Sequence, residues 1–244
     1  MTGDEMKSYQ KDQLDSIAYE LAEIALKTGS FHFSEKPVEW EFGYYMPVDS
    51  NFDRLTNDVR GMDLIIQSFD LIKRFSAIEF DIIAGNSTSG GPPAAVLRYI
   101  WKKNGFTYRP IPKNSKGNIV ELMSRENLEG KRVLLVENRI ETGRSSSAAV
   151  QEIRNYGGGI SHCFVIFDYK FAESAEVIAG KKPYANTNKL QSLFEVHSAL
   201  DYDKIIEVAK HKSHFTEEQF QIMEKWHADP YNYGEKHGHP RIVR

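Results

Sequence analysis

The chain has 244 residues, a formal net charge of −3 and one cysteine, Cys163. The nearly neutral charge gives no electrostatic reason to expect a nucleic-acid partner, and one thiol excludes both a disulfide framework and a cysteine-based zinc site. Hydrophobic residues at 41% and charged residues at 27% are typical of a globular protein with a substantial core. Residues 1–15 are polar and contain no signal core, and no apolar run approaches the roughly 18 residues of a membrane span. We therefore expect a cytoplasmic protein with no membrane partner.

The first third of the chain predicts a helix, short strands and a second helix. Apolar residues recur at helical spacing from Leu14 to Ala25, and Gly29 stands where a C-terminal cap is expected. Aromatic residues alternate loosely between 30 and 49, which predicts short antiparallel strands. An amphipathic helix is expected from about Arg54 to Arg74, although Gly61 inside it costs about 1 kcal/mol of helix propensity.

From residue 80 the pattern changes to strand, loop and helix, repeated. Strands are predicted at 80–84, 106–108, 133–136 and 160–167, and helices at 94–101 and towards residue 156. Such alternation predicts a parallel sheet covered on both faces, with the ligand crevice at the carboxyl ends of its strands. The loops at 85–91, 110–129 and 137–146 then share one rim.

The remainder predicts a helix at 171–178, a last strand at 192–196 and closing helices at 201–209 and 216–226. Thr216 followed by two glutamates is typical of an N-cap with an acidic first turn. His227, His237 and His239 lie in a tail where solvated side chains are favoured over a metal site. Cys163, inside an apolar segment, is expected to be buried and inert.

Two of the rim loops have features of anion sites. The strand 133–136 leads through Glu137 and Asn138 into a turn with Thr142, Gly143 and Ser145–Ser147, where backbone N–H groups and a helix dipole can meet a phosphate. The earlier loop combines Gly90 with three hydroxyls, namely Ser87, Thr88 and Ser89. The alternatives are a plain helix cap and a plain strand-to-helix connection. Neither loop matches the Walker or dinucleotide patterns.

Three basic residues lie between these loops: Arg109, Lys113 and Lys116. They form either a solvated face or a group that neutralises a departing pyrophosphate. Together the segments VLLVENRIETGRSS, AGNSTSGGPPAA, RPIPKNSKGN and SHFTEEQFQIMEKWHADP resemble orotate phosphoribosyltransferases, members of the type I phosphoribosyltransferase family. The resemblance extends over roughly residues 14–230.

The resemblance implies one α/β domain over 1–244, with a parallel sheet flanked by helices. A small hood and N-terminal helix would occupy about 11–52, the core about 54–200, and C-terminal helices and tail about 201–244. Phosphoribosyl pyrophosphate and a nucleobase, orotate, would be the substrates, Mg²⁺ the cofactor and a homodimer the assembly. Mg²⁺ would bind substrate oxygens, and no side chain is assigned as a metal ligand.

The resemblance also assigns roles to individual positions. The 5-phosphate would lie on a loop of five residues, Thr142, Gly143, Arg144, Ser145 and Ser146, and the pyrophosphate on Ser87, Thr88, Ser89 and Gly90. Lys113 and Arg109 would close over the leaving group, and Glu137 and Asn138 would lie at the ribose.

The sequence departs from the family where chemistry is expected. Asn138 replaces the second acidic residue, Glu141 and Arg144 stand where small or hydroxyl residues are usual, and Ser115 replaces a histidine. Glu141 must turn outward or pair with Arg139 or Arg144, since a carboxylate repels a phosphate. EWEFGYYMPVD also lacks a basic Lys-Ser-Pro element. Two alternatives therefore stay open, a non-catalytic binding module of the same fold and a transferase for another base.

Overall fold

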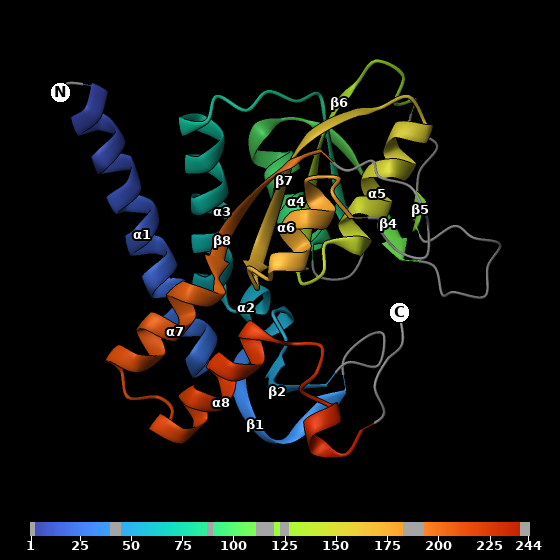
Figure 1. Ribbon diagram of the computed structural model, residues 1–244. Helices are drawn as coiled ribbons and strands as arrows, with labels where there is room; N and C mark the ends of the chain where they lie inside the picture. The colour runs from blue at the N-terminus through green and yellow to red at the C-terminus, as the bar shows by residue number, and fades with distance from the viewer. Residues whose placement is uncertain are drawn as a thin grey trace.

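The computed structural model describes residues 3–39, 45–86, 90–110, 120–122, 127–182 and 193–239, with only the backbone given for 3–7, 109–110 and 120–122. A six-stranded sheet forms the centre of the molecule, with helices on both faces (Figure 1). A separate two-stranded hairpin lies below it, beside the C-terminal helices. The α/β class with a parallel sheet flanked by helices is thereby confirmed.

The central sheet has the order β5-β4-β3-β6-β7-β8. All neighbours are parallel except β4 and β5, which pair antiparallel at one edge. β6 and β7 carry almost uninterrupted apolar runs because both of their faces are covered. The strand bounds are β3 Ile82–Asn86, β4 Asn104–Pro110, β5 Val120–Leu122, β6 Arg132–Ile140, β7 Gly159–Asp168 and β8 Glu195–Asp201.

Two apolar clusters cover the two faces of this sheet. One contains buried residues of α5 and α6, such as Ala149, Ile153 and Val177, together with residues from one face of β6 and β7, such as Leu135 and Val165. The other contains Leu64 and Phe69 of α3 together with residues of α4 and of the terminal segments. The helices concerned are α3 Val59–Phe75, α4 Gly91–Trp101, α5 Arg144–Asn155 and α6 Ala172–Ile178. Cys163 is buried in the first cluster, as predicted, and burial raises its pKa.

The terminal segments pack together on the second face. The predicted N-terminal helix is confirmed as α1 Gly3–Lys27, and the antiparallel strands as β1 Phe31–Glu39 and β2 Tyr45–Ser50. The closing helices are α7 Tyr202–His211 and α8 Glu217–Ala228, followed by the short 3₁₀ turn η1 Glu235–His237. Thr216 caps α8 in a full capping box with Gln219, as its sequence indicates. Within the described residues, no helix combines the length and apolarity needed to cross a bilayer.

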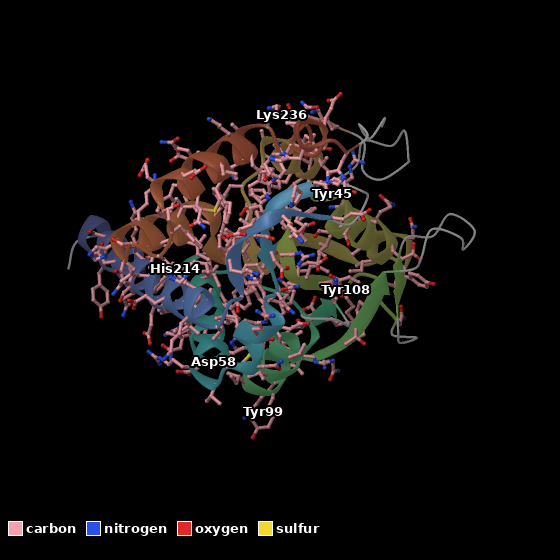
Figure 2. The ribbon with its side chains drawn as sticks, turned by 90° about the horizontal axis from the view of Figure 1, so that it is seen from below. Tyr45, Asp58, Tyr99, Tyr108, His214 and Lys236 are labelled. Atoms are coloured by element: carbon pink, nitrogen blue, oxygen red, sulfur yellow. The ribbon has the colours of Figure 1, made fainter. Side chains whose placement is uncertain are left out.

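Three predictions about local structure are wrong. The helix expected from Arg54 to Arg74 is broken into α2 Asp53–Asn57 and α3, because Asp58 (Figure 2) accepts a hydrogen bond from the Gly61 backbone N–H and starts a new helix. Val59, an apolar residue within the expected helix, is 87% exposed. His227 is also not solvated, since its Nε2 donates to the Tyr169 carbonyl (2.6 Å) and its ring stacks on Tyr202.

Several strand boundaries also differ from the expected ones: β3 lies two residues later than expected, and β4 is longer at both ends. β6 continues four residues past Val136 because Glu137, Arg139 and Ile140 pair with β7. β8 begins at Glu195 and ends at Asp201, whose carboxylate then caps α7 through the Lys204 backbone N–H. His239 is stacked on Tyr45 rather than solvated, whereas His237 is exposed.

Candidate functional site

The predicted phosphate turn lies at the carboxyl end of β6, where the strand passes into α5. Gly143 adopts a left-handed backbone with φ +73°, a conformation that costs other residues roughly 1–2 kcal/mol. A Cβ at this position would lie 3.1 Å from Ile178 Cγ1 and 3.3 Å from the Ser174 carbonyl oxygen of α6. The turn is therefore closed on its outer side by α6, and glycine is needed there for both conformation and space.

The start of α5 presents backbone donors in this turn. Gly143 is the N-cap and supplies no side-chain hydrogen bond, and the first helical bond runs from the Ser147 N–H to the Gly143 carbonyl (3.0 Å). The N–H groups of Arg144, Ser145 and Ser146 thus precede the first intrahelical bond. Together with the positive end of the helix dipole, they form a place where an anion is stabilised.

Glu137 is buried beneath the turn, with 3% of its surface exposed. Its carboxylate accepts hydrogen bonds from Asn86 Nδ2 (3.0 Å) and from Ser146 Oγ (3.2 Å). These partners come from β3 and α5, so the carboxylate connects both loop-bearing elements to β6. Burial raises the pKa of Glu137, while these hydrogen bonds oppose that rise.

Tyr108 of β4 completes the surroundings of this carboxylate. It is paired in register with Asn86, and its side chain is fully buried. Burial and the neighbouring charge of Glu137 raise the pKa of the Tyr108 phenol well above its ordinary value. Residues of the adjacent strands β3 and β4 and of helix α5 therefore surround the Glu137 carboxylate, which is buried.

Asn138, the next residue of β6, is in a different environment. Alternation along the strand directs it to the opposite face of the sheet from Glu137. It is half-buried, and among the described residues its Oδ1 is a buried atom with no hydrogen-bond partner. A buried acceptor without a partner carries a desolvation cost, so this oxygen has capacity for a further hydrogen bond.

Charged residues around the turn are paired with one another. Arg139 Nε lies 2.6 Å from Glu141 Oε1, so of the two alternatives expected for Glu141 the structure shows pairing with a cation. Arg144 Nη2 donates to Glu173 Oε1 of α6 at 2.9 Å, and the Glu173 side chain is only 6% exposed. The guanidinium of Arg144 is thus held beside the turn while its buried Nε has no hydrogen-bond partner among the described residues.

The second loop approaches the same end of β6. A Cβ on Gly90 would lie 2.5 Å from the Val136 carbonyl oxygen, so this glycine permits close contact with the strand. Ser87, Thr88 and Ser89 lie outside the described residues, as do Lys113, Lys116 and Ser115. Arg109 is at the carboxyl end of β4, opposite Glu121 of β5, and only its backbone is among the described parts of the structure. The roles of these residues stay predictions.

Four residues of the site were not predicted from the sequence. Asn86 and Tyr108 contact Glu137, Glu173 pairs with Arg144, and Ser50 accepts from Arg139 Nη1 through its carbonyl oxygen (3.1 Å). Asn86 is the last residue of β3 and the second residue of the GNSTSGG segment, so its place beside a predicted anion loop was a signal in the sequence. Glu173 and Ser50 are distant in the sequence and carry no such signal.

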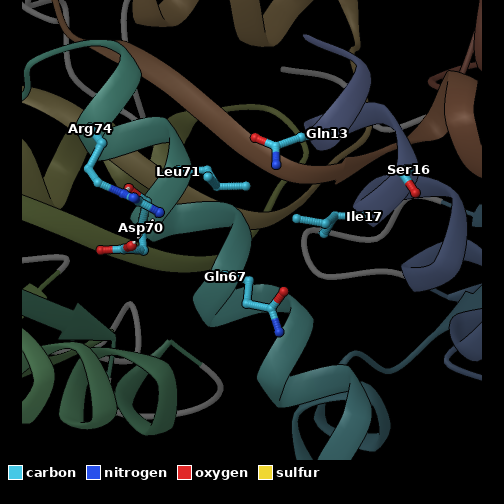
Figure 3. Close-up of a pocket in the computed structure, with 7 residues that line it drawn as sticks. All are labelled: Gln13, Ser16, Ile17, Gln67, Asp70, Leu71 and Arg74. Atoms are coloured by element: carbon cyan, nitrogen blue, oxygen red, sulfur yellow. Dashed lines mark hydrogen bonds and ion pairs between the residues drawn. The ribbon is translucent and has the colours of Figure 1, made fainter. Parts of the chain in front are cut away.

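A pocket of about 370 Å³ lies elsewhere, between α1 and α3 (Figure 3). None of the predicted site residues lines it, and two of its charged groups, Asp70 and Arg74, already pair at 3.0 Å. The residues lining it are Gln13, Ser16, Ile17, Gln67, Asp70, Leu71 and Arg74. The carboxyl edge of the sheet therefore remains the candidate site.

Comparison with known proteins points to one group of enzymes. No family model matches the chain. The orotate phosphoribosyltransferase of Coxiella burnetii is 27% identical over 220 residues, which cover 90% of this chain and 97% of that protein. The match thus includes both loops and β6, and it extends over nearly the whole of the relative.

Solved structures show the same fold at lower identity. The orotate phosphoribosyltransferase of Aeropyrum pernix superposes with a TM-score of 0.64 at 19% identity, covering 78% of this chain and 98% of that one. The Mycobacterium tuberculosis enzyme, in complex with 5-phospho-α-D-ribosyl 1-diphosphate, gives a TM-score of 0.50 at 18% identity, covering 78% and 92%. The α/β architecture is therefore that of the orotate phosphoribosyltransferase fold.

Proposed function

We propose that the chain transfers phosphoribose from phosphoribosyl pyrophosphate to orotate and releases pyrophosphate, as a glycosyltransferase of pyrimidine nucleotide synthesis. The observation that carries the proposal is the start of α5. Gly143 caps it, the N–H groups of residues 144–146 precede the first intrahelical bond, and Ser146 is hydrogen-bonded to the buried Glu137. The names of the relatives agree with this activity.

The 5-phosphate of the substrate would bind in the turn. Its oxygens would accept from the N–H groups of residues 144–146 and from the hydroxyls of Thr142 and Ser145. Arg144 would add a charge-assisted hydrogen bond through the donors that Glu173 does not use. Glu137 would act by orienting Ser146 from below, because its carboxylate is enclosed by protein.

The pyrophosphate would lie on the loop at 85–91, with Ser87, Thr88, Ser89 and Gly90 as its contacts. The bond from the anomeric carbon to the pyrophosphate oxygen breaks, and a bond from orotate N1 to that carbon forms, while the N1 proton is lost to the departing pyrophosphate or to solvent. Arg109 and Lys113 would stabilise the negative charge that develops on the leaving group and exclude water. The ribose carries positive charge in an oxocarbenium-like transition state.

Mg²⁺ fits the oxygen donors at this edge. That ion keeps several waters and is held chiefly by substrate phosphates, and the Asn138 Oδ1 without a partner is an oxygen of the kind it accepts. When bound, Mg²⁺ would neutralise the pyrophosphate. Asn138 would contact the ribose and metal side of the substrate through its amide oxygen, without adding negative charge. We expect the protein to act as a cytoplasmic homodimer.

The test is pyrophosphate release from phosphoribosyl pyrophosphate and Mg²⁺ across a panel of bases. Turnover with orotate supports the proposal, and turnover only with another base replaces orotate as the acceptor. A folded protein that releases no pyrophosphate with any base contradicts the enzyme assignment.

A second candidate is a non-catalytic module that binds phosphoribosyl pyrophosphate or a nucleotide. Two observations favour it: Asn138 lacks a charge, and a phosphate must share Arg144 with Glu173. In that case phosphoribosyl pyrophosphate would raise the unfolding temperature although no base gives turnover. If the ligand changes neither activity nor unfolding temperature, this candidate also fails.

A further inference from the structure

Two histidines and a glutamate converge at the amino end of the sheet, on strands β7 and β8. His162 is paired in register with Glu195, and Phe164, two residues further along β7, is paired with His197. Side chains two residues apart on a strand share a face, so His162, Glu195 and His197 project from one face of the sheet. The two strands are parallel, and this cluster lies close to the start of each.

The donor atoms of the cluster form a small triangle. His162 Nδ1 lies 3.2 Å from His197 Nε2 and 3.6 Å from Glu195 Oε2, and the third side, from His197 Nε2 to Glu195 Oε2, is 3.8 Å. The point equidistant from three atoms so placed is about 2.1 Å from each, which matches the bond lengths of Zn²⁺ to imidazole nitrogen and carboxylate oxygen. An ion therefore fits without movement of the backbone.

The surroundings hold the imidazoles ready for a cation. The side chains of His162 and His197 are 25% and 17% exposed, and the ring of His197 meets Phe164 edge-on at 5.6 Å. Burial and the neighbouring His162 lower the pKa of His197. Glu195, 74% exposed, can approach from the solvent side.

We propose that His162, Glu195 and His197 form a binding site for a divalent transition-metal ion, with Zn²⁺ as the best match. Two imidazoles and one carboxylate are the donors that Zn²⁺ takes with a fourth position for water. The hard ion Mg²⁺ prefers oxygen ligands and is a poor match. The bound ion joins β8, the edge strand of the sheet, to β7.

The site is separate from the proposed transferase centre. His162 lies near the first residue of β7, whereas the phosphate turn follows the last residue of β6. Because β6 and β7 are parallel, the two sites lie at opposite ends of the strands. The proposal does not depend on the transferase function, and either can fail without the other.

The experiment is titration of metal-free, tag-free protein with ZnCl₂, followed by calorimetry and thermal unfolding. We expect one equivalent to bind and to raise the unfolding temperature. His197→Gln should weaken that binding by about 100-fold or more, and Glu195→Gln by about tenfold, because removal even of outer-shell groups costs 10–100-fold. The unfolding temperature of His197→Gln should no longer respond to Zn²⁺.

The matched control is His214→Gln, which removes an exposed imidazole on the α7–α8 side of the molecule (Figure 2). It should bind Zn²⁺ like the unchanged protein. Glu195 is exposed, so its variant keeps the test valid if His197→Gln does not fold. The proposal is overturned if Zn²⁺ does not bind stoichiometrically, or if the two cluster variants and the control bind it with equal affinity. The cluster would then be a hydrogen bond between two histidines.

Discussion

The carboxyl and amino ends of the parallel strands, called here the carboxyl edge and the amino edge, differ in how their polar groups are bonded. At the carboxyl edge, Glu137 and Glu173 are buried and each is bonded to partners from other elements. At the amino edge, Arg132 pairs with Glu79 and Asp81 on the surface, where its side chain is 54% exposed. Exposed pairs of this kind contribute little to stability, although Arg132 lowers the pKa of Asp81 to about 2.

The difference shows where the fold fixes geometry. Buried groups at the carboxyl edge fix the turn before a substrate arrives, and such preorganisation is what electrostatic stabilisation of a transition state requires. The amino edge has room for a solvent-accessible ligand without disturbing the turn. Changes at the first edge should therefore alter catalysis, and matched changes at the second should not.

The largest effect is expected from Gly143→Ala. The substitution strains a left-handed residue and brings a Cβ to 3.1 Å from Ile178. We expect kcat/KM for phosphoribosyl pyrophosphate to fall about 30-fold, equivalent to about 2 kcal/mol. Gly130→Ala is the control, since Gly130 has φ +66° but no atom within 4 Å of the added Cβ. Equal losses of kcat/KM in both variants would contradict a role for the turn in catalysis.

A smaller change, in the opposite direction, is expected from Asn138→Asp. With the proposed substrate bound, the new charge would lie where the ribose becomes positive, so transferase activity should rise by about tenfold, or about 1.4 kcal/mol. Steady-state kinetics would measure it. Asn127→Asp places the same charge at an exposed position near the amino edge and should have no effect. Unchanged or lower activity in folded Asn138→Asp contradicts the role given to this position.

Glu137 should make stability depend on pH. Its pKa is raised above 4.5 in the folded state, so the unfolded chain loses this proton first as the pH rises. The unfolding free energy should then fall between pH 4.5 and the folded pKa, by about 1.4 kcal/mol for each unit of elevation. Denaturant unfolding of the unchanged protein and Glu137→Gln from pH 4 to 8 measures the difference. A difference independent of pH would refute it.

The smallest effect is expected from His197→Gln on catalysis. Because the histidine cluster lies at the amino edge, kcat and KM should stay within about twofold of those of the unchanged protein at 25 °C. Assays with and without Zn²⁺ would measure this. A tenfold loss would show that the two edges are coupled.

The sequence predicted the elements that have strong local signals. The apolar run at 133–136 followed by Gly143 and serines identified both a strand and a helix start, and Thr216 identified the start of α8. The break at Asp58 was missed because Leu55 and Ile65 maintain one apparent helical period across it, although Asp58 caps α3. Local capping prevailed over periodicity there.

The contacts that define the site could not be predicted in the same way. The burial of Glu137 results from Asn86, Tyr108 and Ser146, which three other elements bring together. The pairing of Arg144 with Glu173 joins residues 29 positions apart. Similarly, His162 and His197 become neighbours only through the register of β7 with β8. Sequence patterns predict which end of the strands binds ligands, and tertiary contacts decide which polar groups there are already bonded to the protein.

The most direct test of the account is the simultaneous measurement of pyrophosphate and nucleotide formed from phosphoribosyl pyrophosphate, Mg²⁺ and orotate. We expect one pyrophosphate for each orotidine 5′-phosphate, at a rate that Gly143→Ala lowers and Gly130→Ala does not. Absence of both products from folded protein, with orotate and with every other base offered, would contradict it.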